Sequence, residues 1–167
     1  MAIIKRSPRL GIQNNYNQVV PAQVVADAYK NVDGDPLAPD TADYLGTTIE
    51  GRTYELGDFD FSDIPAGSTI QRITVRKFKR AGFVPVVVAL VCETLDLKVA
   101  GVVRESTKWL VDTTDIDEVL QNRVEAMDYL TPNITRDELA TAGAFTIKSL
   151  ANHTQVGSPG EPPRFDG

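Results

Sequence analysis

The pattern of apolar and polar residues predicts strands through the middle of the chain, over residues 43–92. Residues 69–80, "TIQRITVRKFKR", alternate, which places Ile73 and Val75 on one side of a strand. The apolar run "FVPVVVALVCE" that follows is typical of a strand buried on both faces. In "RTYELGDFDF" we expect a β-bulge at Gly57 to shift the alternation.

The second half of the chain mixes predicted strands and helices. Residues 95–111 indicate two short strands around Gly101, and "AFTIKSLAN" indicates a last strand. Residues 113–130 carry apolar side chains at helical spacing, so we expect one helix there. Thr135 and Glu138 have the spacing of a capping box, which predicts a short helical turn.

Together these elements predict one mainly β domain. Short strands separated by turns favour an antiparallel β-sandwich or jelly roll with one or two short helices and extended termini. Residues 1–23 lack periodicity and are interpreted as an extended N-terminal arm. The β-sandwich domain is expected over residues 24–156, and residues 157–167 form a Pro- and Gly-rich tail.

Charge is unevenly distributed along the 167 residues. The net charge is −6, which argues against general affinity for phosphate backbones. Basic and acidic residues number 5 and 10 in residues 1–66, 8 and 3 in residues 67–111, and 4 and 10 in residues 112–167. Such an acidic–basic–acidic chain can pair with itself or with copies of itself.

The basic block supplies the candidate interaction site. On one face of the predicted strand stand Arg72, Arg76, Phe78 and Arg80. A platform for nucleic acid can have this composition. The acidic flanks disfavour nucleic acid, and basic residues also commonly guard strand edges. We therefore predict a protein partner, or another copy of the chain, for these four residues.

The sequence offers no catalytic set, and we expect neither enzyme activity nor a cofactor. The single histidine, His153, is interpreted as a surface residue, and the single cysteine, Cys92, as a small buried apolar side chain. There is no zinc-binding spacing, P-loop or GxGxxG motif. A hydrolase using Asp58, Asp60 or Asp63 is the least favoured class.

Two binding alternatives stay open. Four aspartates crowd one loop, as calcium sites do, but without the spacing of an EF-hand; these are Asp33, Asp35, Asp40 and Asp43. Turn formation explains them equally well. A carbohydrate module would need several exposed aromatics, whereas Trp109 is the only tryptophan. No apolar run is long enough to span a membrane, and residues 1–10 do not resemble a secretory signal, so no membrane partner is expected.

One segment carries a resemblance to a known class of proteins. Residues 56–82, "LGDFDFSDIPAGSTIQRITVRKFKRAG", resemble a pattern found in β-sandwich proteins of tailed-phage virions. The matching positions are Phe59, Phe61, Ile64, Pro65, Ala66, Gly67, Ile70, Ile73, Val75 and Arg80. A looser likeness extends over residues 43–153. Related patterns also occur in secreted jelly-roll modules that bind surfaces or sugars.

The resemblance implies a virion structural protein that is assembled in the host cytoplasm. The role it favours is that of an auxiliary capsid protein, meaning a decoration or cement protein. Its partners would be the major capsid protein or tail subunits, and copies of itself. The alternatives are a tail or neck component and a carbohydrate-binding β-sandwich module.

The chain departs from that pattern at its C-terminal end. In place of a closing strand it has "GSPGEPPRFDG". A sandwich without that strand has an open edge, which can accept a strand from a neighbour or from the chain's own arm.

Overall fold

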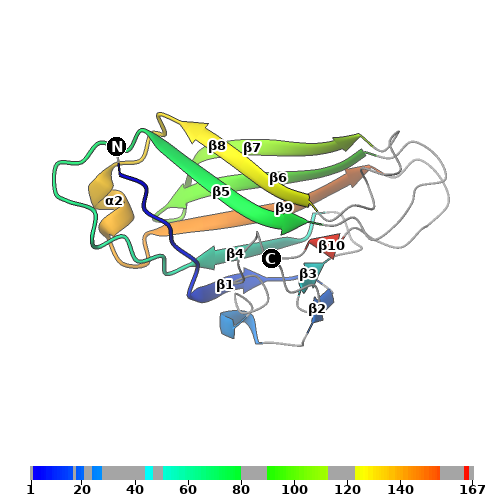
Figure 1. Ribbon diagram of the computed structural model, residues 1–167. Coiled ribbons are helices and arrows are strands. Elements are labelled where there is room, and N and C mark those ends of the chain that lie inside the picture. The colour runs from blue at the N-terminus through cyan, green and yellow to red at the C-terminus, as the bar shows by residue number, and fades with distance from the viewer. Residues whose placement is uncertain are drawn as a thin grey trace.

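A computed structural model describes most of the chain and shows a mainly β protein built from antiparallel sheets, as predicted (Figure 1). The described residues are 2–16, 18–20, 24–27, 44–46, 51–79, 90–112, 123–154 and 164–165.

The largest sheet has five strands in the order β1-β4-β9-β6-β7. Their bounds are Leu10–Asn14 for β1, Thr53–Gly57 for β4, Phe145–Thr154 for β9, Leu90–Val99 for β6 and Val102–Asp112 for β7. The strands β6 and β7 are longer than expected, and they meet at the predicted turn, where Ala100 and Gly101 both adopt positive φ. The last predicted strand is confirmed as β9.

Two smaller sheets accompany the large one. The strands β5 (Arg72–Lys79) and β8 (Arg123–Leu130) pair along their whole length, and this two-stranded ribbon crosses in front of the large sheet (Figure 1). The third sheet has the order β10-β3-β2, with bounds Arg164–Phe165, Tyr44–Gly46 and Gln18–Val20. Its strand β10 lies beside β5. The arrangement is that of a sandwich.

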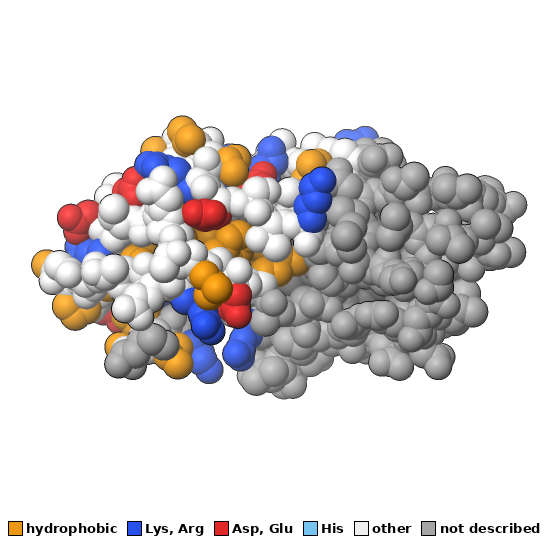
Figure 2. Space-filling view, turned by 90° about the horizontal axis from the view of Figure 1, so that it is seen from above, with side chains coloured by type: hydrophobic (Ala, Val, Ile, Leu, Met, Phe, Trp, Pro, Cys, Tyr) orange, Lys and Arg blue, Asp and Glu red, His pale blue; other side chains and the backbone are white. Residues whose placement is uncertain are grey.

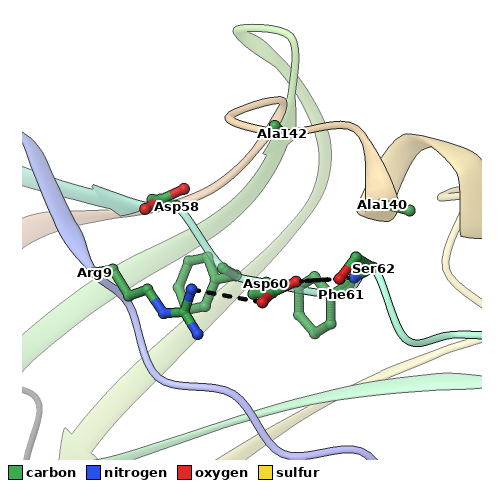
Figure 3. Close-up of a pocket in the computed structure, with 8 residues that line it drawn as sticks. Arg9, Asp58, Asp60, Phe61, Ser62, Ala140 and Ala142 are labelled. Atoms are coloured by element: carbon green, nitrogen blue, oxygen red, sulfur yellow. Dashed lines mark hydrogen bonds and ion pairs between the residues drawn. The ribbon is translucent and has the colours of Figure 1, made fainter.

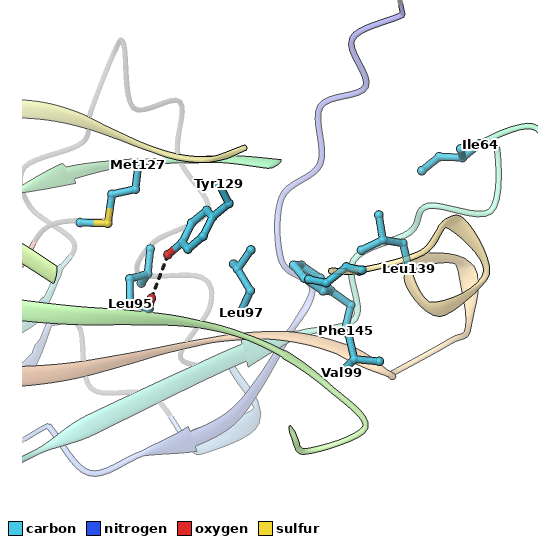
Figure 4. Packing of buried hydrophobic residues seen from close by; sticks show 9 residues of the cluster. Ile64, Leu95, Leu97, Val99, Met127, Tyr129, Leu139 and Phe145 are labelled. Carbon is cyan, nitrogen blue, oxygen red and sulfur yellow. Dashed lines mark hydrogen bonds between the residues drawn. The ribbon is translucent and has the colours of Figure 1, made fainter. Parts of the chain in front are cut away.

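The core lies between the ribbon and the large sheet. Leu95 and Leu97 of β6 are 1% and 0% exposed, because alternate residues of that strand face the ribbon. Met127 and Tyr129 of β8 cover them from the other side (Figure 4). The Tyr129 hydroxyl donates to the Leu95 carbonyl at 2.8 Å, so a polar bond joins the two layers inside the core.

The turn between β4 and β5 closes one end of this core. The rings of Phe59 and Phe61 lie 5.6 and 5.8 Å from the ring of Phe145, in edge-to-face contact. Ile64 is buried in the same cluster, and its carbonyl accepts a hydrogen bond from Arg136 Nε at 2.7 Å. This bond fastens the turn to the helix that begins at Arg136.

That helix, α2 (Arg136–Ala140), confirms the predicted capping box. The Thr135 side chain accepts from the Glu138 amide, and the Glu138 carboxylate accepts from the Thr135 amide. A short polar motif specifies this turn, and the motif can be recognised without knowledge of the fold.

The helix predicted over residues 113–130 is wrong for residues 123–130, which form β8. Met127 and Tyr129 are buried whereas Asp128 and Leu130 are exposed, so the true period is two. Pairing with β5 and burial against β6 decide the structure here, in preference to helical spacing. Residues 113–122 lie outside the described residues.

The bulge expected at Gly57 is also misplaced. Gly57 ends β4 in regular pairing, and the irregularity lies in the neighbouring strand β1, between Gly11 and Gln13. The absence of a side chain at Gly57 has another reason. A Cβ there would lie 2.6 Å from Ile12 Cδ1, so the glycine leaves room for the isoleucine of the bulge.

A second irregularity lies in β7, opposite the step from Leu97 to Lys98. Beside this bulge, the consecutive side chains of Arg104 and Glu105 both contact the connection between β8 and β9. Arg104 Nη2 lies 2.5 Å from Glu138 Oε1, and Glu105 Oε1 accepts from the Asn133 amide at 2.9 Å. Consecutive side chains of a regular strand would point to opposite faces, so the bulge allows both contacts.

Both chain ends contribute strands. Residues 10–14 of the expected arm form β1 and pair with β4, and the chain thereby covers that edge of the sheet itself. Tyr16 is 5% exposed, and its hydroxyl lies 3.3 Å from Ser149 Oγ. Residues 164–165 of the expected tail form β10. Whether either end also contacts neighbouring subunits stays a prediction.

The bond between the layers can be tested with Tyr129→Phe. We expect this change to lower the free energy of unfolding by about 1–2 kcal/mol, because the core loses the hydrogen bond from the Tyr129 hydroxyl to the Leu95 carbonyl. Urea unfolding followed by circular dichroism measures the loss. The adjacent Leu130→Ala is the control, with a change within about 0.5 kcal/mol, since Leu130 is 64% exposed. Equal losses in the two variants would contradict the assigned role of the hydroxyl.

Candidate functional site

The predicted interaction site lies on the ribbon, on the face opposite the core. Ile73 and Val75 of β5 pack against the core, and Arg72, Thr74 and Arg76 are exposed, as the alternation predicts. Seen from above, the described half of the molecule shows basic, acidic and apolar side chains interspersed (Figure 2). No large field of one charge covers it in this view.

The charges on this face are only partly neutralised. Asp128 of β8 stands opposite Thr74, and its Oδ1 accepts from the Thr74 hydroxyl at 2.5 Å. Its Oδ2 lies 3.8 Å from Arg72 Nη1, which is an ion pair without a hydrogen bond. Arg76 stands opposite Ala126, and no described carboxylate pairs with it. The face therefore keeps a net positive charge.

The other two predicted site residues are placed incompletely. Phe78 belongs to β5 opposite Val124, and its side chain lies outside the description. Arg80 lies outside the described residues. The structure thus brings Arg72 and Arg76 onto one exposed face, and the contribution of Phe78 and Arg80 stays a prediction.

A second charged cluster fastens the N-terminal segment to the turn before β5. Arg6 pairs with Asp63 and donates from Nε to the Asp60 carbonyl, and Arg9 Nη1 lies 3.5 Å from Asp60 Oδ2. The uneven charge distribution suggested self-pairing in general. It could not identify these partners, because more than 50 residues separate them in the sequence.

Beside this cluster lies a cavity of about 210 Å³, lined by Arg9, residues 58–62 and two alanines, Ala140 and Ala142 (Figure 3). Hydrogen bonds from the Ser62 side chain and amide, together with the nearby Arg9 and Arg6, hold the pKa of Asp60 below its usual range. The Ser62 hydroxyl donates to Asp60 Oδ1 at 2.6 Å. A carboxylate so engaged is a weak proton acceptor, and the arrangement is that of a structural turn.

The remaining chemical candidates are only partly placed. Cys92 stands opposite Asn152 and His153 opposite Val91, so the two positions are one step out of register; their side chains, like that of Trp109, lie outside the description. Among the described residues, no three His, Cys, Asp or Glu side chains gather as a metal site would require. Asp33, Asp35, Asp40 and Asp43 lie outside the described residues.

A buried ion pair on the large sheet was not found by the sequence analysis. The pair lies on the sheet face opposite the ribbon, because Lys98 follows Leu97 and successive side chains of a strand point to opposite faces. Lys98 Nζ donates to both carboxylate oxygens of Glu55 at 2.8 Å, and Thr146 Oγ1 donates to Oε1 at 2.6 Å. The side chains of Lys98 and Glu55 are only 14% and 8% exposed. Nothing local in the sequence marks this pair, since its members come from different strands.

The hydrogen bonds to Glu55 determine the direction in which its pKa is shifted. Burial alone would raise the pKa of this carboxyl. The hydrogen bonds from Lys98 and Thr146, with the charges of Lys98 and Lys148, outweigh burial and lower the pKa below its usual value of 4.5. The group is therefore a fixed carboxylate at neutral pH.

Among the described residues, no helix has the length and apolar character needed to cross a membrane. Comparisons of the chain with protein-family models, with curated proteins and with solved structures gave no match.

Stability at acid pH tests the Glu55 pair. Because the folded-state pKa is lowered, the pair contributes stability above pH 4.5, and that stability is lost as pH falls through the folded-state value. We expect Glu55→Gln to cost about 1–3 kcal/mol at pH 7 and progressively less below pH 4.5. Urea midpoints at several pH values measure this. The exposed Asp58→Asn is the control, and a pH-independent cost for Glu55→Gln would contradict the assignment.

Proposed function

We propose that this chain is a structural protein of a tailed-phage virion, and that it serves as an auxiliary capsid protein. It acts by burying surface against neighbouring subunits and carries out no chemistry. The β-domain provides the binding surface, and the chain ends add contacts where they leave the domain.

One observation carries this proposal, namely the place of residues 56–82 in the fold. Six of the apolar residues that resemble the tailed-phage pattern lie in the core or pack against it, whereas Pro65 and Ala66 of the turn are exposed; the six are Phe59, Phe61, Ile64, Ile70, Ile73 and Val75. Gly67 adopts a φ of 77°, as its turn requires. The resemblance thus falls on residues that build the domain. It supports the fold-level analogy, and the role follows by that analogy.

The polar chemistry of the described residues supports a binding role. Asp60, Asp63 and Glu55 are each engaged in intramolecular pairs. The exposed side chains include arginines such as Arg72 and aliphatic residues such as the 64% exposed Leu130, interspersed with acidic residues. Such a mixture is typical of surfaces that bind proteins.

Binding in an assembly needs little affinity per contact. Many copies on a regular shell add their contacts through avidity. The strands β1 and β10 near the two ends pair with the chain's own strands, so the neighbours would meet the residues left outside that pairing. Ile3, which is 79% exposed, is one such residue.

The proposal is tested on particles from the bacterium that produces the chain. We expect gradient-purified particles to contain the chain in many copies by mass spectrometry, and gold-labelled antibody against the purified chain to mark the capsid. The control is the same antibody absorbed beforehand with the chain. Label confined to the tail or neck would overturn the capsid role. A chain that stays in the supernatant when particles are pelleted would overturn the virion assignment itself.

A further inference from the structure

The outer face of the ribbon is a sheet face that no described element covers. In Figure 1 the strands β5 and β8 lie in front of the large sheet, with no labelled element in front of them. The side chains of Arg72 and Asp128 are 55% and 46% exposed, and Arg76 is exposed as well. Leu130, which pairs with Arg72 in the strand register, is 64% exposed.

The two arginines of this face keep hydrogen-bond donors available. The nearest carboxylate oxygen to Arg72 is 3.8 Å away, and the other oxygen of Asp128 is occupied by Thr74. Arg76 has no carboxylate partner among the described residues. Along a strand the two arginines stand about 13 Å apart. A guanidinium group binds a carboxylate through two parallel hydrogen bonds, which a partner surface can supply.

The composition of the face identifies the class of partner. Asp128 stands between the arginines and would repel a chain of phosphates, and the net charge of −6 adds to that repulsion. Arginine is instead enriched in contacts between proteins, and the exposed Leu130 adds apolar surface beside Arg72. The face therefore fits a protein surface that presents separate carboxylates.

The chain itself carries such carboxylates in excess. Outside residues 67–111 there are 20 acidic and 9 basic residues, and inside that block there are 3 acidic and 8 basic residues. A copy of the chain is thus an acidic partner for its own basic face. Two ribbon faces packed on each other would place arginines against arginines, so the contact joins unlike surfaces.

We propose that the ribbon face of one copy, through Arg72 and Arg76, docks on an acidic surface of a second copy, so that copies associate head to tail. This inference deepens the proposed function and rests on it for the assumption that the chain works in many copies. It names the partner and the polarity of the contact.

The experiment is sedimentation velocity of the purified full-length chain over a range of concentrations. At about 20 mM salt the wild type associates, and at about 500 mM salt the association weakens because the charges are screened. We expect Arg72→Gln with Arg76→Gln to weaken association about tenfold or more. The matched control is Lys5→Gln with Lys108→Gln, which removes two other exposed cations and leaves association within about threefold of wild type. Equal urea midpoints for the two double variants exclude misfolding.

The head-to-tail arrangement of the copies is tested separately, by mixing wild type with the double-arginine variant. A tagged Arg72→Gln, Arg76→Gln chain should be monomeric alone and should still be bound by untagged wild type, because its acidic surface is intact. If wild type and the tagged variant do not associate, the head-to-tail contact is wrong.

Three further outcomes would overturn the proposal. The first is a wild type that stays monomeric at every concentration, and the second is a double-arginine variant that associates like the lysine control. The third is binding of a labelled oligonucleotide that depends on Arg72 and Arg76 and exceeds self-association at the same salt. A monomeric wild type that is nonetheless found on particles would refute this inference alone, and absence from particles would refute the proposed function.

Discussion

The fold depends on covering the apolar face of the five-stranded sheet. Leu95 and Leu97 present that face, and the ribbon of β5 and β8 covers it with Met127 and Tyr129. Burial of these side chains supplies the main favourable free energy of such a domain. The ribbon has only two strands, so the turn before β5 and the helix α2 have to close the end of the core. Phe59, Phe61 and Leu139 do so.

Several of the charged side chains that the structure describes around this core have partners within the chain. Glu55 and Lys98 pair on the far face of the large sheet, and Arg6 and Arg9 pair with the turn before β5. The ribbon face differs, because one carboxylate is shared between Thr74 and Arg72 and no carboxylate among the described side chains reaches Arg76. Pairing inside the chain thus leaves a small basic surface on an acidic protein. A partner that approaches the ribbon face would therefore meet a local excess of positive charge, although the net charge of the chain is negative.

The sequence predicted features that depend on neighbouring residues. The alternation around Ile73 and Val75 identified β5, and the spacing of Thr135 and Glu138 identified the cap of α2. Features that depend on distant residues were not predictable. The pair of Lys98 with Glu55 spans 43 positions and leaves no local pattern. Residues 123–130 were assigned to a helix because their apolar positions satisfy helical spacing in the sequence alone, whereas pairing with β5 makes them a strand.

The bulge in β7 has a mechanical consequence. By turning Arg104 and Glu105 toward the connection between β8 and β9, it ties the edge of the large sheet to that connection, at Asn133 and at Glu138 of α2. The ribbon and the large sheet are separate hydrogen-bonded ladders, so away from the chain connections it is side-chain contacts that join one layer to the other. The ion pair and the amide bond hold the connection that follows β8 against β7, and the Tyr129 hydroxyl joins the ribbon to β6 near the middle of the core. A sideways load on the ribbon would therefore be passed to the large sheet through these three contacts.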